Sequence, residues 1–241
     1  MPVGRYLKPQ TSNLYRYSEM NPLHSFNVSV EEAIQIQEAL KDRIILEKTF
    51  SEVRTIGGGD VAYSKDGNLL FGAIVVLSFP DMEILDTATA DGKTLFPYIP
   101  SLLSFREGPI LIKTLQRLRL KPDMMIYDGH GIAHPRGMGL ASHMGLWLDL
   151  PSIGCAKTPL LDEFISPGPS RGSFEWIRRE GKKVGTVLRT RENVKPLFIS
   201  PGHRIDLSTS IQLILESCKG YRFPEPLRKA HQASRKMLYG I

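Results

Sequence analysis

The chain has 241 residues and carries 31 Lys and Arg against 25 Asp and Glu, which leaves a formal net charge of +6. Hydrophobic residues make up 41% of the chain, a share that is typical of a globular domain and excludes a disordered chain. Its two cysteines, Cys155 and Cys218, exclude a disulfide scaffold and predict a reducing, cytoplasmic environment. The longest apolar run, Leu69 to Leu77, has nine residues and is too short for a membrane-spanning helix.

We predict an irregular, mildly basic leader over residues 1–28 and a single domain over residues 29–241. Ser29 and Glu32 have the spacing of a helix capping box, and apolar residues recur at helical intervals as far as residue 46. The domain is therefore predicted to begin with an amphipathic helix.

Three strand-like segments follow, over residues 55–64, 68–79 and 82–90. Turn residues at Asp66-Gly67 and Pro80-Asp81 separate them, which predicts a three-stranded antiparallel meander. The middle segment is apolar at both alternating positions, so both of its faces should be buried inside a covered sheet.

Helical and strand patterns alternate in the rest of the chain. We expect helices over residues 101–120 and 140–148, strands over 123–128, 152–156 and within 172–200, and two final helices. This order predicts one α/β domain with a mixed sheet, in which an antiparallel meander is joined to parallel strands and helices flank the sheet. Composition and periodicity leave the strand order open.

Two acidic residues lie on apolar, strand-like segments. Asp60 and Asp128 would be costly there as ionised carboxylates unless they were paired or bound a cation. Glu107 lies where a helix begins. Three carboxylates meeting at one point would suit Mg²⁺, with Mn²⁺ as a substitute, better than zinc. Since they are far apart in sequence, spacing alone favours the simpler interpretation of a helix cap, a turn residue and a surface residue.

A glycine-rich segment runs from Asp128 to Gly139. Its four glycines indicate close approach of the backbone to another group. It lacks the spacing of a dinucleotide-binding fingerprint and of a P-loop. A zinc site formed by His130, His134 and His143 is one hypothesis, and a tight loop with incidental histidines is the one that the pattern favours.

The segment Pro97-Tyr98-Ile99-Pro100 places an aromatic and an aliphatic side chain between two prolines, which makes it stiff. A stiff apolar tip can act as a wedge between nucleic-acid bases, although a turn before a helix is the commoner interpretation. Lys157 ends a predicted strand, and His203 precedes a helix. Each of these two side chains, taken alone, more often faces solvent.

Basic residues cluster in the last third of the chain. A cationic surface around an acidic pocket suits a nucleic-acid partner, with a solvated face of mixed charge as the alternative. The clustered residues are Arg171, Arg178, Arg179, Lys182, Lys183, Arg189, Arg191, Arg228, Lys229, Arg235 and Lys236.

Together these segments resemble endonuclease V, a family that nicks nucleic acid beside deaminated bases. The resemblance covers roughly residues 30 to 230. It rests on motifs that occur in the same order as in that family: Pro97-Tyr98-Ile99-Pro100, Phe105-Arg106-Glu107, Asp128-Gly129-His130-Gly131, His134-Pro135-Arg136, Ala141-Ser142-His143, Gly154-Cys155-Ala156-Lys157 and Ser200-Pro201-Gly202-His203.

The resemblance implies an RNase H-like fold in which Asp60, Glu107 and Asp128 hold a divalent metal. It also implies that Lys157 and His203 lie beside this metal and the scissile phosphate, so that all five residues are catalytic. The implied reaction is cleavage of DNA one nucleotide beyond a deaminated base, on its 3′ side, as the first step of repair.

The same resemblance implies how the altered base is recognised. A wedge would hold the strands apart at the lesion, and a neighbouring pocket would accept hypoxanthine through backbone contacts. The wedge residues are Pro97, Tyr98, Ile99 and Pro100, and the pocket residues are Gly129, Gly131 and His134.

Two alternatives to a DNA endonuclease stay open. An inosine-specific endoribonuclease of the same family would use the same residues, and a non-catalytic lesion-binding protein would use the carboxylates only structurally. Beyond the nucleic acid, we expect no membrane partner and identify no protein partner.

Overall fold

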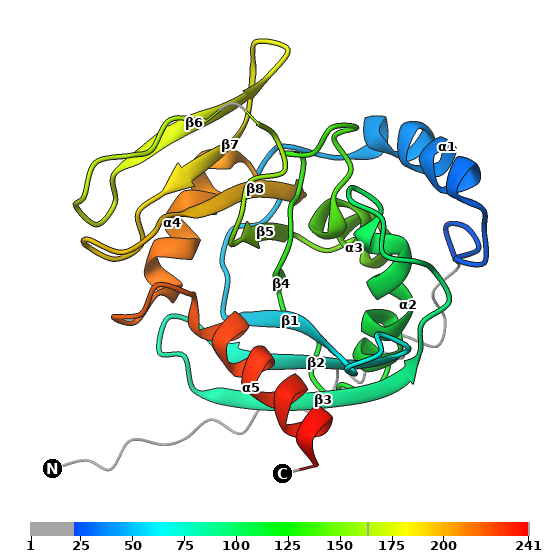
Figure 1. The fold of residues 1–241 in the computed structure, drawn as a ribbon. Helices are drawn as coiled ribbons and strands as arrows, with labels where there is room; N and C mark the ends of the chain where they lie inside the picture. Colours follow the sequence, from blue (N-terminus) through cyan, green and yellow to red (C-terminus); the bar gives the residue numbers. More distant parts are fainter. Residues whose placement is uncertain (1–21, 163, 241) are drawn as a thin grey trace, which may run out of the picture.

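The computed structural model describes residues 22–162 and 164–240. Within them an eight-stranded sheet has the strand order β3–β2–β1–β4–β5–β8–β7–β6, with helices on both faces (Figure 1). The strands are β1 (Thr55–Tyr63), β2 (Leu69–Ser78), β3 (Ile84–Lys93), β4 (Met124–Tyr127), β5 (Ser152–Ala156), β6 (Phe174–Arg179), β7 (Lys182–Leu188) and β8 (Leu197–His203). The helices are α1 (Val30–Leu40), the 3₁₀ turn η2 (Lys41–Arg43), α2 (Leu103–Leu115), α3 (Leu140–Leu148), α4 (Leu207–Ser217) and α5 (Glu225–Tyr239).

The predicted mixed sheet is confirmed. Strands β1, β2 and β3 form the antiparallel meander, and β4 and β5 extend it as parallel strands beside β1. Strands β8, β7 and β6 then continue the sheet with antiparallel pairing. No helix of the described residues is long and apolar enough to cross a bilayer.

Both faces of β2 are buried, as its sequence predicts. Ile74 and Val76 pack against α2 and α3 on one face. Val75 and Leu77 belong to the cluster under α4 and α5 on the other face. Successive residues of a strand point to opposite faces of the sheet. Apolar residues at both odd and even positions are therefore typical of a strand that is covered on both faces.

The first helix is shorter than predicted. Its capping box between Ser29 and Glu32 is present, but the helix ends at Leu40 and Ile44 is extended. Ile44 packs against the core cluster of β6, β7 and β8, whereas Ala33 packs with Phe96 and Phe105. Ile44 is therefore apolar because it packs against this second cluster, although the helix itself ends before it.

The end of the predicted leader packs against the helices. The ring centroids of Phe26 and Trp147 lie 4.7 Å apart, and the Nε2 atoms of His24 and His143 lie 2.6 Å apart. Residues 22–28 form neither helix nor strand, in keeping with an irregular segment. Residues 1–21 lie outside the described residues, and the boundary at residue 29 stays a prediction.

A glycine of β1, Gly58, lets α5 lie directly on the strand. A Cβ atom on Gly58 would lie 2.2 Å from the backbone carbonyl of Pro226, in the first turn of α5. A side chain here would therefore push the helix off the strand. The close approach places the middle of α5 against Asp60, two residues further along β1.

Candidate active site

Asp60 and Asp128 lie side by side although they are far apart in sequence. Strands β1 and β4 are parallel, with Gly59 opposite Tyr127, so the residues that follow are neighbours. Asp60 lies an even number of residues from Ile56, and Asp128 lies an even number from Ile126, and both isoleucines point to the face that α5 covers. The two carboxylates therefore point to that face as well. Asp60 is 7% exposed, and Asp128 is partly buried.

Glu107 approaches these residues from the opposite face of the sheet. It lies in α2 and accepts a hydrogen bond from the Tyr63 hydroxyl at the end of β1. Burial, together with the negative charges of Asp60 and Asp128, raises the pKa of Glu107 to about 8. The three carboxylates are therefore close enough to interact through their charges.

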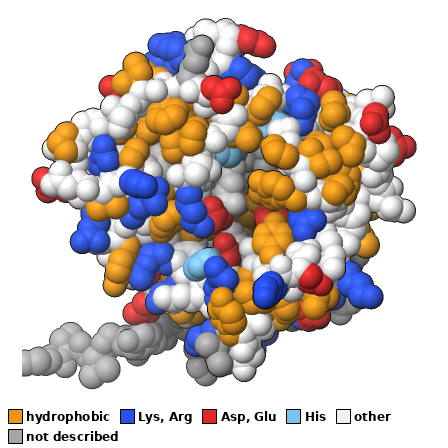
Figure 2. All heavy atoms as spheres, viewed as in Figure 1, with side chains coloured by type: hydrophobic (Ala, Val, Ile, Leu, Met, Phe, Trp, Pro, Cys, Tyr) orange, Lys and Arg blue, Asp and Glu red, His pale blue; other side chains and the backbone are white. Residues whose placement is uncertain are grey.

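One cleft of about 730 Å³ joins these groups. Its walls include Asp60, Glu107, Asp128 and Lys157. Figure 2 shows acidic side chains and a histidine grouped in a hollow at the centre of this face, with Lys and Arg side chains around them. Of the basic residues that cluster in the sequence, Arg235 lines this cleft, whereas Arg179, Lys182 and Lys183 line a separate cavity.

The donor chemistry of the cleft fits a divalent cation with oxygen ligands. The three carboxylates supply only oxygen atoms, which suits Mg²⁺ or Mn²⁺. Each carboxylate has its own protein partner: Ser234 donates to Asp60 at 2.5 Å, Tyr63 donates to Glu107 and Lys157 to Asp128. Among residues 22–162 and 164–240, no three metal-binding side chains are already arranged around one cation position.

Lys157 lies where the sequence places it, directly after β5. Its ammonium is 2.5 Å from the Asp128 carboxylate, and its side chain is 48% exposed. Burial raises the pKa of Asp128, and the charge of Lys157 opposes that shift. The lysine is thus close to the carboxylates yet open to a ligand that enters the cleft.

His203 does not lie beside the carboxylates, which corrects the expectation from the motif. Strand β8 is antiparallel to β5, with His203 opposite Ser152 at the start of β5. Lys157 follows the other end of that strand, roughly 16 Å away at the usual rise per residue. The pairing direction, which the sequence leaves open, separates the two residues.

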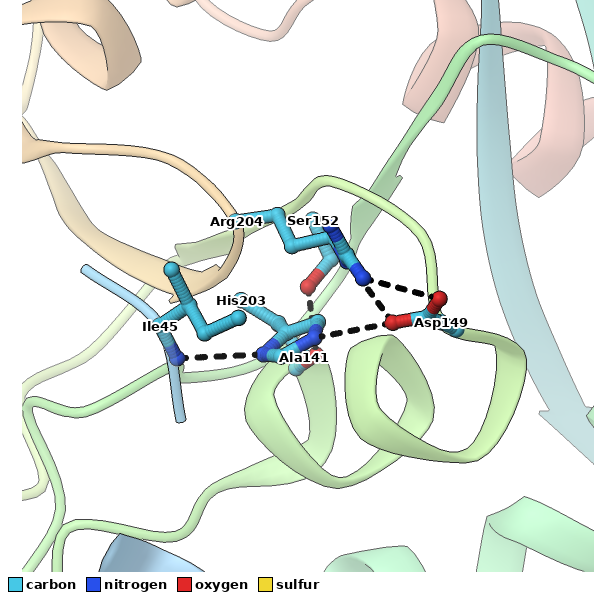
Figure 3. Close-up of polar contacts among 6 residues, drawn as sticks. All are labelled: Ile45, Ala141, Asp149, Ser152, His203 and Arg204. Carbon is cyan, nitrogen blue, oxygen red and sulfur yellow. Dashed lines mark hydrogen bonds and ion pairs between the residues drawn. The ribbon is translucent and has the colours of Figure 1, made fainter. Parts of the chain in front are cut away.

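The surroundings of His203 are those of a structural histidine. Its Nδ1 accepts a hydrogen bond from the Ile45 backbone at 3.3 Å, and its Nε2 lies 3.5 Å from Asp149, which also pairs with Arg204 (Figure 3). Its side chain is 3% exposed, and burial lowers the pKa of the imidazole. This histidine therefore links β8, the end of α3 and the segment after α1.

A different histidine occupies the cleft. His231, in α5, has Nδ1 3.4 Å from an Asp60 oxygen, is half exposed and lines the cleft together with Arg235. Sequence reasoning missed it because only the folding of α5 back over β1 brings it to Asp60. Its helical spacing of three and four residues from Ser234 and Arg235 is the one clue that these side chains share a helix face.

A second cavity, of about 240 Å³, opens beside the cleft. Gly129, His134 and Tyr98 line it, and Tyr98 and Asp128 line the cleft as well. Tyr98 is 68% exposed, while Ile99 packs against the apolar cluster under α1. Pro97 and Pro100 on either side are exposed. The proline-flanked tip therefore projects an aromatic ring between the two cavities.

The glycine loop forms the back of this second cavity. Gly131 donates its backbone N–H to Ser200 at 2.8 Å, and a Cβ atom on it would lie 2.0 Å from the Pro201 carbonyl oxygen. Gly131 therefore holds the loop against β8 from behind, whereas Gly129 lies in the lining. Burial lowers the pKa of His134 to about 4, so the imidazole is neutral, and its Nε2 donates to the Ser101 carbonyl at 2.8 Å.

The three histidines of the alternative zinc hypothesis have separate partners. His130 contacts the Thr158 carbonyl, His134 the Ser101 carbonyl and His143 the Ser104 hydroxyl. Within the described part of the chain they form no metal cluster.

The mixed sheet and the carboxylates on its neighbouring parallel strands define an RNase H-like nuclease fold. The chain matches the family model Endonuclease V over residues 38–232. It therefore belongs to the endonuclease V family and is an endonuclease, a hydrolase of phosphodiester bonds.

Relatives and solved structures agree with this assignment. Endonuclease V of Dictyoglomus turgidum is 49% identical over 208 residues, which cover 86% of this chain and 90% of the relative. The structure of endonuclease V from Streptomyces avermitilis superposes with a TM-score of 0.83 at 39% identity, covering 88% of this chain and 94% of that one. Ciona intestinalis endonuclease V, solved with DNA that contains an inosine followed by a ribo-adenosine, has a TM-score of 0.78 at 31% identity, covering 88% of this chain and 98% of that one.

Proposed function

We propose that this protein is a metal-dependent endonuclease that recognises a deaminated base, hypoxanthine or inosine, in DNA. It cleaves the strand one nucleotide beyond the lesion on the 3′ side and so initiates repair. The observation that carries the proposal is the shared border of the two cavities, where Asp128 and Tyr98 line both. The Ciona relative bound to inosine-containing DNA supports the substrate class.

Asp60, Glu107 and Asp128 are proposed to hold Mg²⁺, with Mn²⁺ as a substitute. When bound, the ion supplies a water nucleophile and polarises the phosphoryl oxygen. Lys157 offers its ammonium to the negative charge that develops on the phosphate. His231 and Ser234, both in contact with Asp60, orient that carboxylate toward the cleft.

Recognition is proposed to depend on the neighbouring cavity. Tyr98, held by Pro97, Ile99 and Pro100, keeps the strand open where a base leaves the stack, which costs only a few kcal/mol and least for a mispaired base. The extruded base would enter the cavity that the Gly129–Gly131 loop and His134 shape.

An incision assay tests the proposal. Inosine-containing DNA should be nicked with added Mg²⁺, no nick should form with EDTA, and an adenosine control should stay intact. The products should carry a 3′-hydroxyl and a 5′-phosphate. Efficient cleavage of inosine in RNA but not in DNA would favour the endoribonuclease alternative, and binding without any cleavage would favour the non-catalytic one.

The cysteines support a proposed cytoplasmic location. Cys155 and Cys218 are both free and belong to one apolar cluster. Burial raises the pKa of Cys218 to about 12, so its thiol stays protonated. Thiols of this kind suit a reducing compartment. Fractionation of cells that express the full chain tests the location.

Tyr98→Ala should weaken discrimination between inosine and adenosine strands without disturbing the carboxylates. Loss of the exposed ring removes a stacking contact worth roughly 1–3 kcal/mol, which corresponds to about 5- to 160-fold in kcat/KM for the inosine strand. Tyr98→Phe keeps the ring and is the control. Unchanged discrimination in Tyr98→Ala would contradict the wedge role.

The corrected histidine assignment makes a paired prediction. His203→Gln should lower the unfolding free energy by about 1–2 kcal/mol through loss of its buried contacts, and leave cleavage within a few-fold of wild type. His231→Gln should lower kcat at least about tenfold, since it removes a contact of Asp60, with little effect on stability. Thermal unfolding and incision kinetics of both variants measure this. The reverse pattern would restore His203 to the catalytic site.

A further inference from the structure

Two aromatic rings in the loop between α4 and α5 are stacked with cations. The guanidinium carbon of Arg228 lies 3.3 Å from the ring centre of Tyr221, while 48% of Tyr221 stays exposed. The ring of Phe223 has Lys157 at 5.3 Å and Arg222 at 5.1 Å. Alternating aromatic rings and cations are the signature of a surface that binds single-stranded nucleic acid.

This surface is joined to the catalytic cleft at two points. Lys157 contacts both Asp128 and the Phe223 ring. Arg228 precedes His231 by three residues in α5, which is one turn and roughly 4.5 Å along the helix axis. Tyr221 itself lies outside the residues that line either cavity. Arg228 and Lys157 therefore connect the aromatic rings of this loop to the cleft.

The Tyr221 ring is held in place before any ligand arrives. Arg228 pairs with Glu225 at 2.5 Å, so its guanidinium is fixed from one side and covers the tyrosine ring from the other. A pre-positioned ring loses little conformational entropy when a base stacks on it.

We propose that Tyr221 is a stacking platform for a base of the substrate strand on the 3′ side of the scissile bond. The inference depends on the proposed function, because the lesion then fills the cavity beside Tyr98 and the strand beyond the cleaved bond leaves past Lys157. Tyr98 and Tyr221 would thus contact the strand on the two sides of the scissile bond.

The test compares inosine-containing single strands that extend two or ten nucleotides beyond the scissile bond on the 3′ side. On the long strand, Tyr221→Ala should raise KM roughly 5- to 160-fold with kcat unchanged, which is the range expected for one stacked base. On the short strand it should match wild type. Tyr221→Phe should behave as wild type on both. Phe174→Ala, which removes another exposed aromatic ring from the edge strand β6, is the matched control and should change neither KM.

Three outcomes would overturn the platform: equal KM for Tyr221→Ala and wild type on the long strand, the same loss on both strands, or a loss that follows the length of the 5′ flank. If Tyr221→Ala does not fold, single abasic nucleotides along the 3′ flank of the wild-type substrate give the answer, since one position should raise KM in the same range. Failure of the wild-type enzyme to cut any inosine strand would refute the proposed function instead. Weaker binding of a long DNA strand by Tyr221→Ala would then still identify the platform.

Discussion

Asp60→Ala and Asp128→Ala are each expected to lower kcat for an inosine-containing strand at least about 1,000-fold, which corresponds to about 4 kcal/mol of transition-state stabilisation. The two carboxylates lie next to each other on parallel strands, so removal of either leaves the proposed ion with an incomplete site. The dissociation constant for the same strand should change only a few-fold, because Tyr98 and the lining of the second cavity are left largely intact.

The control for this prediction is Asp91→Asn, which neutralises an exposed carboxylate on β3 away from the cleft. It should cut as wild type does. Binding measured by fluorescence anisotropy in EDTA separates lost chemistry from lost recognition. Full activity in either alanine variant would remove the basis for the metal-dependent mechanism.

Gly58→Ala should have the second large effect, and it should act on stability and activity together. The new methyl group would lie 2.2 Å from the Pro226 backbone, a contact that only a shift of α5 can relieve. Overpacking of this kind costs about 1–3 kcal/mol of unfolding free energy. Because α5 also carries His231 and Ser234 against Asp60, kcat should fall at least about tenfold under conditions in which the variant is still folded.

Gly168→Ala is the matched control for Gly58→Ala. Its nearest neighbour would be the Ser173 side chain at 3.5 Å, an ordinary van der Waals contact. Urea unfolding and incision kinetics should both stay close to wild type. A stable, fully active Gly58→Ala would show that α5 does not depend on close contact with β1.

Local patterns in the sequence predicted most of the elements and singled out two of the carboxylates. The apolar alternation of β2 predicts burial on both faces, and the capping box predicts the start of α1. Asp60 and Asp128 stand out because a carboxylate is costly in a covered strand. These inferences succeed because helix caps, strand periodicity and the desolvation of a charge depend on neighbours that are close in sequence or on the residue itself.

The direction of strand pairing and the path of the last helix were decided only by the tertiary structure. Antiparallel pairing of β8 with β5 removes His203 from the carboxylates, although its motif resembles that of the family. The return of α5 over Gly58 of β1 brings His231 to Asp60, and the same helix carries Arg228, which packs on the Tyr221 ring. Contacts between residues more than a hundred positions apart depend on how whole elements pack, and no local periodicity encodes that arrangement.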